Sequence, residues 1–181
     1  PADYDPPVCW VPHDVDASSA DPEWVTSDRW GPFGGGLVYT SYAQCRLFLA
    51  MAGADAGGVV RFPLEFESGL LRARFRPLDG QLYVCGLRGW QTSAARDGAL
   101  HRIRFTGAPV RMPAALRVRN EGLEISFTDA LDKETAADPD SWGVEQWNYR
   151  WTKAYGSDAY SVANPGKSGK DAVEVKSARL S

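Results

Sequence analysis

The feature that most constrains the fold is an internal repeat of short runs, each led by a turn glycine. The repeat has two copies, and each copy contains two runs. In the first run of each copy, a glycine is followed by Leu and then, one or two places later, by an aromatic residue. The second run of each copy also begins with a glycine turn. The equivalent glycines are 44 residues apart in the first pair and 40 in the second. The runs are GGLVYTSYAQCRLF from Gly35 and DGQLYVCGLRGWQT from Asp79, followed by GGVVRF from Gly57 and DGALHRIRF from Asp97.

A period of 40 to 50 residues built from short strands is typical of a β-propeller blade. Between the copies lies SGLLRARFRP, in which Leu, Ala and Phe alternate with Arg72, Arg74 and Arg76, as expected of a half-buried strand. The expected strands are 37–42, 46–50 and 58–62 in one blade and 70–76, 81–86 and 99–105 in the next. Propellers typically need about four to eight blades, so we expect the chain to be part of a larger ring.

Lysine usage divides the chain into two parts. Residues 1–107 contain ten Arg and no Lys, whereas residues 108–181 contain five of each. The change falls at TGAPVRMP, where glycine and prolines interrupt regular structure. The second part holds further strand-like runs, GLEISFTDALD, WGVEQWNYRW and DAVEVKSARL, with one short helical turn expected within 130–140. The sequence therefore predicts an all-β chain: a partial β-propeller of about two blades over 1–107, then a small immunoglobulin-like β-sandwich over 108–181.

Charge and cysteine content exclude several classes of protein. The net charge of −3 argues against a nucleic-acid partner, which favours a concentrated basic face. No apolar run approaches the ~20 residues of a membrane span. The chain begins at Pro1, so we expect a processed or excerpted protein. Cys9, Cys45 and Cys85 form no CxxC or CxxCH motif; either Cys9 and Cys45 form a disulfide or the thiols are free and buried.

The repeat also carries a family resemblance. GGLVYTSYAQCRLFL, GGVVRFPLEFESGLLRARFRPLDGQLYVCGLRGWQT and DGALHRIRFTG resemble the last blades of soluble quinoprotein sugar dehydrogenases of the glucose and sorbosone type. The resemblance covers about residues 8–107 and is closest to large exported proteins of planctomycete and verrucomicrobial bacteria, which often add a c-type cytochrome domain. In such proteins a stretch like GLEISFTDALDKETAADPDSWGVEQWNYRW follows as a sandwich.

This resemblance implies a periplasmic or extracellular protein whose partners are the remaining propeller blades. PQQ, calcium or haem would belong to the parent protein, because the family's catalytic His and its quinone and calcium residues match no position of this chain. We therefore expect no cofactor and no catalytic residue in this segment.

The connection between the two strands of the second repeat is the main candidate for ligand contact. Arg88, Trp90, Gln91 and Arg96 lie in it, where a propeller presents a loop at one end of its channel. The alternative is a plain connection between strands. A metal site is a further candidate, formed by His13, Asp14 and Asp16, because loop carboxylates beside an imidazole suit a hard or borderline cation. The spacing does not fit an EF-hand, and a surface loop with Asp turns is the alternative.

Two other groups of residues have two interpretations each. Arg72, Arg74 and Arg76, with Arg102 and Arg104, could line a groove for an acidic or sugar-like ligand, or could pair with acids such as Glu65, Glu67 and Asp79. Trp147, Tyr149 and Trp151 could stack on a sugar or form a buried core or seam.

Three functions remain open from the sequence. The first is a structural segment that buttresses the propeller and contacts carbohydrate, without a complete active site. The second is a segment that completes a sugar-oxidising quinoprotein site. The third is a free-standing carbohydrate-binding module.

Overall fold

The computed structural model describes residues 7–53, 56–153 and 156–181. Over these residues the chain is all-β, with 37% in strands and 6% in helices, as the sequence predicts. The strands pair in antiparallel sheets, and none of the sheets that the structure describes closes on itself. The chain divides into two compact units, Pro1–Ala130 and Leu131–Ser181, which are treated separately below.

The bounds of the elements are as follows. The first unit contains β1 (Ser19–Trp24), η1 (Gly31–Phe33), β2 (Leu37–Ser41), β3 (Arg46–Ala52), β4 (Gly57–Arg61), β5 (Gly69–Phe75), β6 (Leu82–Leu87), β7 (Gly98–Ile103), β8 (Pro113–Arg119) and β9 (Gly122–Phe127). The second unit contains α1 (Lys133–Ala137), η2 (Pro139–Ser141), β10 (Val144–Gln146) and β11 (Asp171–Val173). Within the described ranges, no helix has the length and apolar character needed to cross a membrane.

The first sheet is a four-stranded meander in the order β1-β2-β3-β4. The strands expected at 37–42, 46–50 and 58–62 are confirmed as β2, β3 and β4, because alternating apolar residues and glycine turns mark them in the sequence. The strand β1 was not expected. Its residues, SADPEW, include Pro22, and its register with β2 shifts between Ser19 and Pro22. Proline and an irregular register are tolerated there because β1 is an edge strand.

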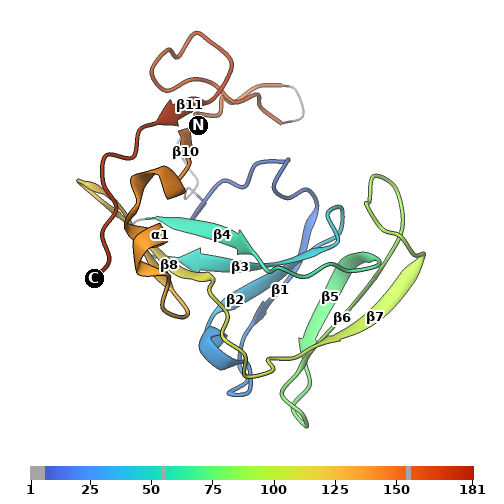
Figure 1. Ribbon diagram of the computed structural model, residues 1–181. Coiled ribbons are helices and arrows are strands. Elements are labelled where there is room, and N and C mark those ends of the chain that lie inside the picture. The colour runs from blue at the N-terminus through green and yellow to red at the C-terminus, as the bar shows by residue number, and fades with distance from the viewer. Residues whose placement is uncertain (1–6, 54–55, 154–155) are drawn as a thin grey trace. The chain divides into compact units, whose positions relative to one another are not determined.

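The second sheet has three strands in the order β5-β6-β7, as expected from the second copy of the repeat. A register shift between Leu70 and Arg72 interrupts the simple alternation that the sequence predicts for β5. The extra residue turns Leu70 into the core together with Ala73, and both are almost fully buried. Figure 1 shows this sheet beside the first one, with β5 next to β1 and β2.

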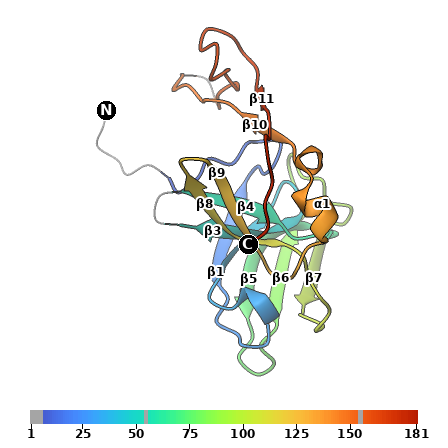
Figure 2. The ribbon, with the colours of Figure 1, turned by 60° about the vertical axis from the view of Figure 1, so that its left-hand side comes forward.

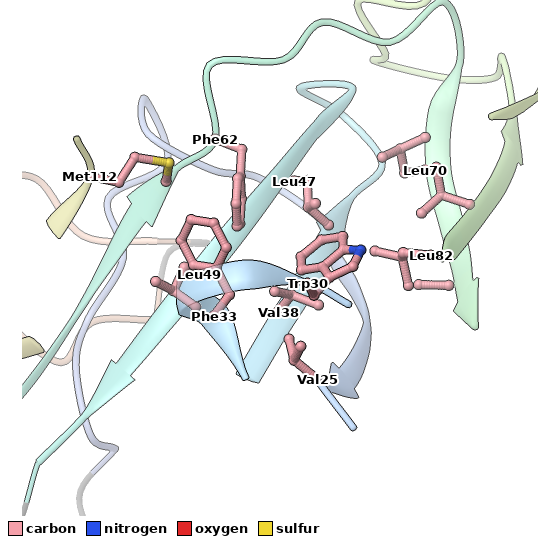
Figure 3. Packing of buried hydrophobic residues seen from close by; sticks show 12 residues of the cluster. Val25, Trp30, Phe33, Val38, Leu47, Leu49, Phe62, Leu70, Leu82 and Met112 are labelled. Carbon is pink, nitrogen blue, oxygen red and sulfur yellow. The ribbon is translucent and has the colours of Figure 1, made fainter. Parts of the chain in front are cut away.

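The core lies between these two sheets and is centred on Trp30 (Figure 3). The indole makes edge-to-face contacts with Phe33, Phe62 and Phe75, at centroid separations of 6.2, 5.9 and 5.1 Å. Such aromatic pairs add to the stabilisation from buried area. The surrounding aliphatic side chains come from both sheets: Val38, Leu47, Leu49, Leu70, Leu82 and Val84.

Two carboxylates of β1 bind the backbone of β5, where the sheets meet. Asp21 Oδ2 accepts from the N–H of Ala73 at 2.9 Å, and Glu23 Oε1 accepts from the N–H of Phe75 at 3.4 Å. Asp21 also accepts from Arg74 Nη1 at 2.6 Å. The edge N–H groups of β5 are thus satisfied by side chains, so β5 does not join β1 in one continuous ladder and the two sheets remain separate layers.

The hairpin β8–β9 completes the first unit. It lies against β3 and β4 (Figure 2), and the backbone carbonyl of Leu116 lies close to Gly53. The hairpin therefore belongs to the first compact unit, which ends at residue 130. The predicted domain boundary near residue 108, the ring of blades and the immunoglobulin-like sandwich all stay predictions.

The second unit has little regular structure. The short helix expected within 130–140 is present as α1, and Asp132 caps it by accepting from the N–H of Thr135 at 2.9 Å. The strand expected over WGVEQWNYRW is shorter than predicted: β10 ends at Gln146, and only the bridge between Asn148 and Tyr160 follows. Trp151 is 92% exposed and so is not part of a buried core.

Replacement of Trp30 should destabilise the first unit more than replacement of an exposed tryptophan. Trp30→Ala leaves a cavity among three phenylalanine rings, so we expect a loss of about 3–5 kcal/mol in the free energy of unfolding. Urea unfolding followed by far-UV circular dichroism measures it. The control is Trp24→Ala, since this side chain is 60% exposed and should cost about 1 kcal/mol or less. Equal losses for the two variants would contradict the assigned core.

The stability of the second unit should depend on Asp171. Its carboxylate accepts from Ser161 Oγ at 2.6 Å and from the N–H groups of Val162 and Ala163 at 2.7 and 3.0 Å. These hydrogen bonds, that of Ser161 above all, lower the pKa of Asp171 against the opposing effect of desolvation. A lowered folded-state pKa gives stability that is complete above the unfolded value of about 4 and is lost as the pH falls through the folded value.

Amide hydrogen exchange at Val162 and Ala163 tests this dependence. We expect Asp171→Asn to accelerate exchange at pH 7, and this difference from the unaltered chain to shrink as the pH falls through the folded-state pKa of Asp171, after correction for intrinsic exchange rates. Glu174→Gln, which removes a nearby exposed carboxylate, should leave exchange unchanged. Fast exchange at pH 7 in the unaltered chain would show that Asp171 does not hold this segment.

Candidate functional site

The connection between β6 and β7, residues 88–97, is held firmly against the turn between β2 and β3; it is called the 88–97 loop below. Thr92 Oγ1 donates to the carbonyl of Tyr42 at 3.1 Å, and the N–H of Ser93 donates to the carbonyl of Ala43 at 2.9 Å. In return, the hydroxyl of Tyr42 donates to the carbonyl of Trp90 at 3.2 Å. These contacts join residues about 50 positions apart and fix the loop to the neighbouring sheet.

The far side of the 88–97 loop is fixed to Glu67. The N–H groups of Ala95 and Arg96 both donate to the carbonyl of Glu67, at 2.9 and 2.8 Å. The side chain of Arg96 forms an ion pair with the carboxylate of the same residue, with Nε 3.0 Å from Oε1. Both partners are largely exposed, so this ion pair orients Arg96 more than it stabilises the fold.

Two residues at this contact have backbone angles that side chains other than glycine rarely adopt. Cys45 has φ 51° and Gln91 has φ 54°. Such strain costs about 1–3 kcal/mol per residue and tends to occur at ligand sites, where the surrounding structure maintains it. Cys45 is buried, and its sulfur receives a hydrogen bond from Ser93 Oγ at 3.4 Å. The strained turn and the strained loop therefore support one another.

The cysteines are free thiols. Cys9, Cys45 and Cys85 make no disulfide. Of the two predicted alternatives for Cys45, a disulfide with Cys9 or a buried free thiol, the structure has the buried free thiol. Burial raises the pKa of the Cys9 thiol, and Cys85 is exposed on β6.

The loop displays side chains to solvent although its backbone is fixed. Trp90 is 82% exposed, and Arg88 and Gln91 are exposed beside it in the sequence. An exposed aromatic ring on a fixed backbone loses little conformational entropy when it binds a ligand. Arg88, Trp90, Gln91 and Arg96 thus remain the predicted ligand residues, now placed on one well-fixed loop.

The predicted metal residues lie in a short turn before β1. The N–H groups of Val15 and Asp16 both donate to the carbonyl of Pro12. Asp16 is buried, and its Oδ2 accepts from Ser19 Oγ at 2.6 Å, whereas His13 and Asp14 are exposed. In the part of the chain that the structure describes, no three His, Cys, Asp or Glu side chains are grouped in a way that could hold a metal ion.

The buried Asp16 affects a neighbouring tyrosine. Burial is the main cause that raises the pKa of Tyr39, and the charges of Asp16 and Cys9 raise it further. Tyr39 therefore stays protonated, and its ring stacks on Phe48 with centroids 5.1 Å apart. The contacts of Asp16 with Ser19 and Tyr39 are those of a residue that stabilises the fold.

The predicted arginine pairs are present only in part. Arg74 pairs with Asp21 and, at 3.6 Å, with Glu23, neither of which was expected; Arg76 pairs with Asp79 at 3.2 Å, as expected. Glu65 and Glu67 pair instead with Arg46 and Arg96. Desolvation opposes ionisation of Asp79, but hydrogen bonds from Gln81, Tyr83 and Arg76 outweigh it and lower the pKa of this carboxyl.

A separate groove of about 690 Å³ lies between the end of the first sheet and β8. Its lining consists of glycines, alanines and larger apolar residues, among them Trp24, Leu49 and Leu116. Arg117 and Arg119 also line it, but both are bound to Glu124, at 3.0 and 2.8 Å. The groove therefore has few polar side chains free to orient a ligand, which a specific small-molecule site needs.

Comparison with known proteins gives no relative for this chain. No protein-family profile, no curated protein and no solved structure matches it. The functional argument therefore rests on the residues and their geometry.

Removal of the Thr92 hydroxyl should loosen the 88–97 loop. Thr92→Val keeps the shape of the side chain but removes the hydrogen bonds to the carbonyl of Tyr42 and the N–H of Ala94. We expect a loss of about 1–2 kcal/mol in unfolding free energy and faster amide exchange at Ser93 and Ala94. Thr106→Val, on the exposed segment after β7, is the matched control and should leave this exchange unaltered. Unaltered exchange in Thr92→Val would contradict the fixed loop.

Proposed function

We propose that this chain is a carbohydrate-contact segment of a larger exported β-propeller-type protein, and that the 88–97 loop makes the contact. The chain supplies scaffold and ligand contact rather than a complete active site. The observation that carries the proposal is the combination of a fixed backbone with an 82% exposed Trp90. An exposed aromatic ring on a fixed backbone loses little conformational entropy when it packs against a ligand, and this supports the proposal.

The side chains of the loop suit a sugar. A flat indole face packs on the C–H surface of a pyranose ring, while Arg88 and Gln91 can donate hydrogen bonds to hydroxyl or carboxylate oxygens. The strained φ of Gln91 supports the proposal, because such backbone strain tends to occur at ligand sites.

The arrangement of the first unit is compatible with blades. Two antiparallel meanders, β1–β4 and β5–β7, pack over a shared core, and antiparallel meanders are the units from which propeller blades are built. The resemblance to quinoprotein sugar dehydrogenases agrees with this arrangement and supports an exported parent protein.

Fluorescence titration tests the proposal. A panel of soluble polysaccharides that includes neutral and acidic chains is added to the full chain, and tryptophan emission is followed. We expect at least one polysaccharide to quench the emission, and Trp90→Ala to weaken its binding by about tenfold, because the stacked ring is lost.

Two comparison variants identify the site. Trp24→Ala removes an exposed tryptophan beside the groove, and Trp151→Ala removes one from the second unit. Both should bind as the unaltered chain does. No response to any polysaccharide, or a loss in either comparison variant with none in Trp90→Ala, would overturn the assignment to the loop.

The alternative, that the loop completes a sugar-oxidising site, is distinguished in the full-length parent protein. Under the scaffold proposal, joint replacement of Arg88 and Trp90 leaves the turnover number of any sugar oxidation intact. A large loss of turnover in a folded variant would instead support the enzymatic alternative.

A further inference from the structure

The outward face of the second sheet is strongly basic, and its use is not explained by the fold. It is called the arginine face below. On the strands its side chains point away from the core: Arg72, Arg74, Tyr83, Cys85, Leu87, Leu100 and Arg102. We include in it the exposed Arg76 and Arg104, which directly follow β5 and β7. Directly paired residues of an antiparallel sheet share a face, so the row Arg74, Tyr83 and Arg102 lies across all three strands. The next row, with Ala73 and Val84, points into the core.

Only part of this charge is neutralised. Arg74 is held by Asp21 and Arg76 by Asp79. Among the residues that the structure describes, no carboxylate forms an ion pair with Arg72, Arg102 or Arg104. All three are exposed. The face therefore keeps several guanidinium groups available for an external anion.

The chemistry of the face defines its ligand. An apolar surface laid over these arginines would bury unpaired charge, which is strongly unfavourable. Guanidinium groups bind carboxylates and sulfates with two parallel hydrogen bonds. Arg104 directly follows β7 and is two residues from Arg102, so two guanidinium groups are close in the sequence at this end of the sheet, which suits a polymer that repeats its charges.

The arginine face is continuous with the 88–97 loop. The pairs of β6 and β7 run from Tyr83–Arg102 through Cys85–Leu100 to Leu87–Gly98, and the loop begins at the next residue. Leu100 is 71% exposed and Leu87 is 46% exposed, so a small apolar patch lies between the charged end and the loop. Such a surface offers apolar contact for sugar rings together with cations for their acidic groups.

We infer that the arginine face binds an anionic polysaccharide, a polymer of carboxylate- or sulfate-bearing sugars, as an extension of the contact at the 88–97 loop. This inference rests on the proposed function and narrows its ligand class. It assigns Arg102 and Arg104 to the anionic groups, with Arg72 on the far edge strand of the same sheet as a further cation.

The test uses polygalacturonate and its fully methyl-esterified form, which share a backbone and differ in charge. Binding to the full chain is measured by isothermal titration calorimetry. We expect polygalacturonate to bind, its methyl ester to bind about tenfold more weakly or worse, and added salt to weaken the binding of the charged form. Dextran sulfate and dextran repeat the comparison for sulfate, so the two arms show which anionic group is preferred.

The variants are R102Q/R104Q and the matched control R61Q, which neutralises an exposed arginine on the first sheet. We expect the double variant to lose at least about tenfold in affinity for the charged polymer, and R61Q to lose none. Thermal melting confirms that each variant is folded. Unaltered binding by the folded double variant would overturn the inference.

The remaining outcomes separate this inference from the proposed function. Equal binding of polygalacturonate and its methyl ester would overturn the inference that the ligand is anionic, but would leave the proposed carbohydrate contact at the 88–97 loop in place. Equal affinity for poly-glutamate or duplex DNA would show that the arginine face binds anions in general, and would overturn the inference that its ligand is a polysaccharide. Absence of binding to every sugar polymer overturns both proposals.

Discussion

The first unit depends on how β1 meets β5. Asp21 and Glu23 use their carboxylates, rather than the β1 backbone, to satisfy the edge N–H groups of β5. A continuous ladder would have extended one sheet, whereas this contact ends it and leaves two sheets to stack. Stacking encloses Trp30 and its phenylalanine neighbours, and it brings the turn after β2 against the 88–97 loop. The position of the candidate site is thus a consequence of two acidic side chains on an edge strand.

Much of the first unit could be predicted from the sequence because its signals are local. Glycine turns and alternating apolar residues mark β2 to β7 within a few residues of their observed bounds. The strand β1 could not be predicted in the same way, since Pro22 and its acidic neighbours are typical of a loop, and only the partner strands make the segment extended. The irregularity at Leu70 also has no local signal, because the need to fill the core between the sheets decides it.

The position of the candidate site in the sequence was predictable, but the contacts that fix its backbone were not. The spacing of the strands predicts a connection that contains Arg88, Trp90 and Gln91. Tyr42 and Glu67 hold this connection through hydrogen bonds; both are distant from it in the sequence, and no local pattern pairs them with it. The metal prediction illustrates the same limit, since alternate acids in a sequence do not show that Asp16 turns inward while His13 and Asp14 face solvent. Tertiary contacts, rather than residue types, decide both outcomes.

The attachment of the 88–97 loop to the neighbouring sheet also has a thermodynamic consequence. Because the hydrogen bonds of Thr92 and Ser93 end on the turn after β2, the ordered loop and the stacked sheets form one cooperative unit. A ligand that binds only the ordered loop must then stabilise the packing around Trp30, about 2.7 kcal/mol at a ligand concentration of a hundred times its dissociation constant. The same linkage works in reverse: a substitution that loosens the core will lower the ligand affinity of a loop that it never touches.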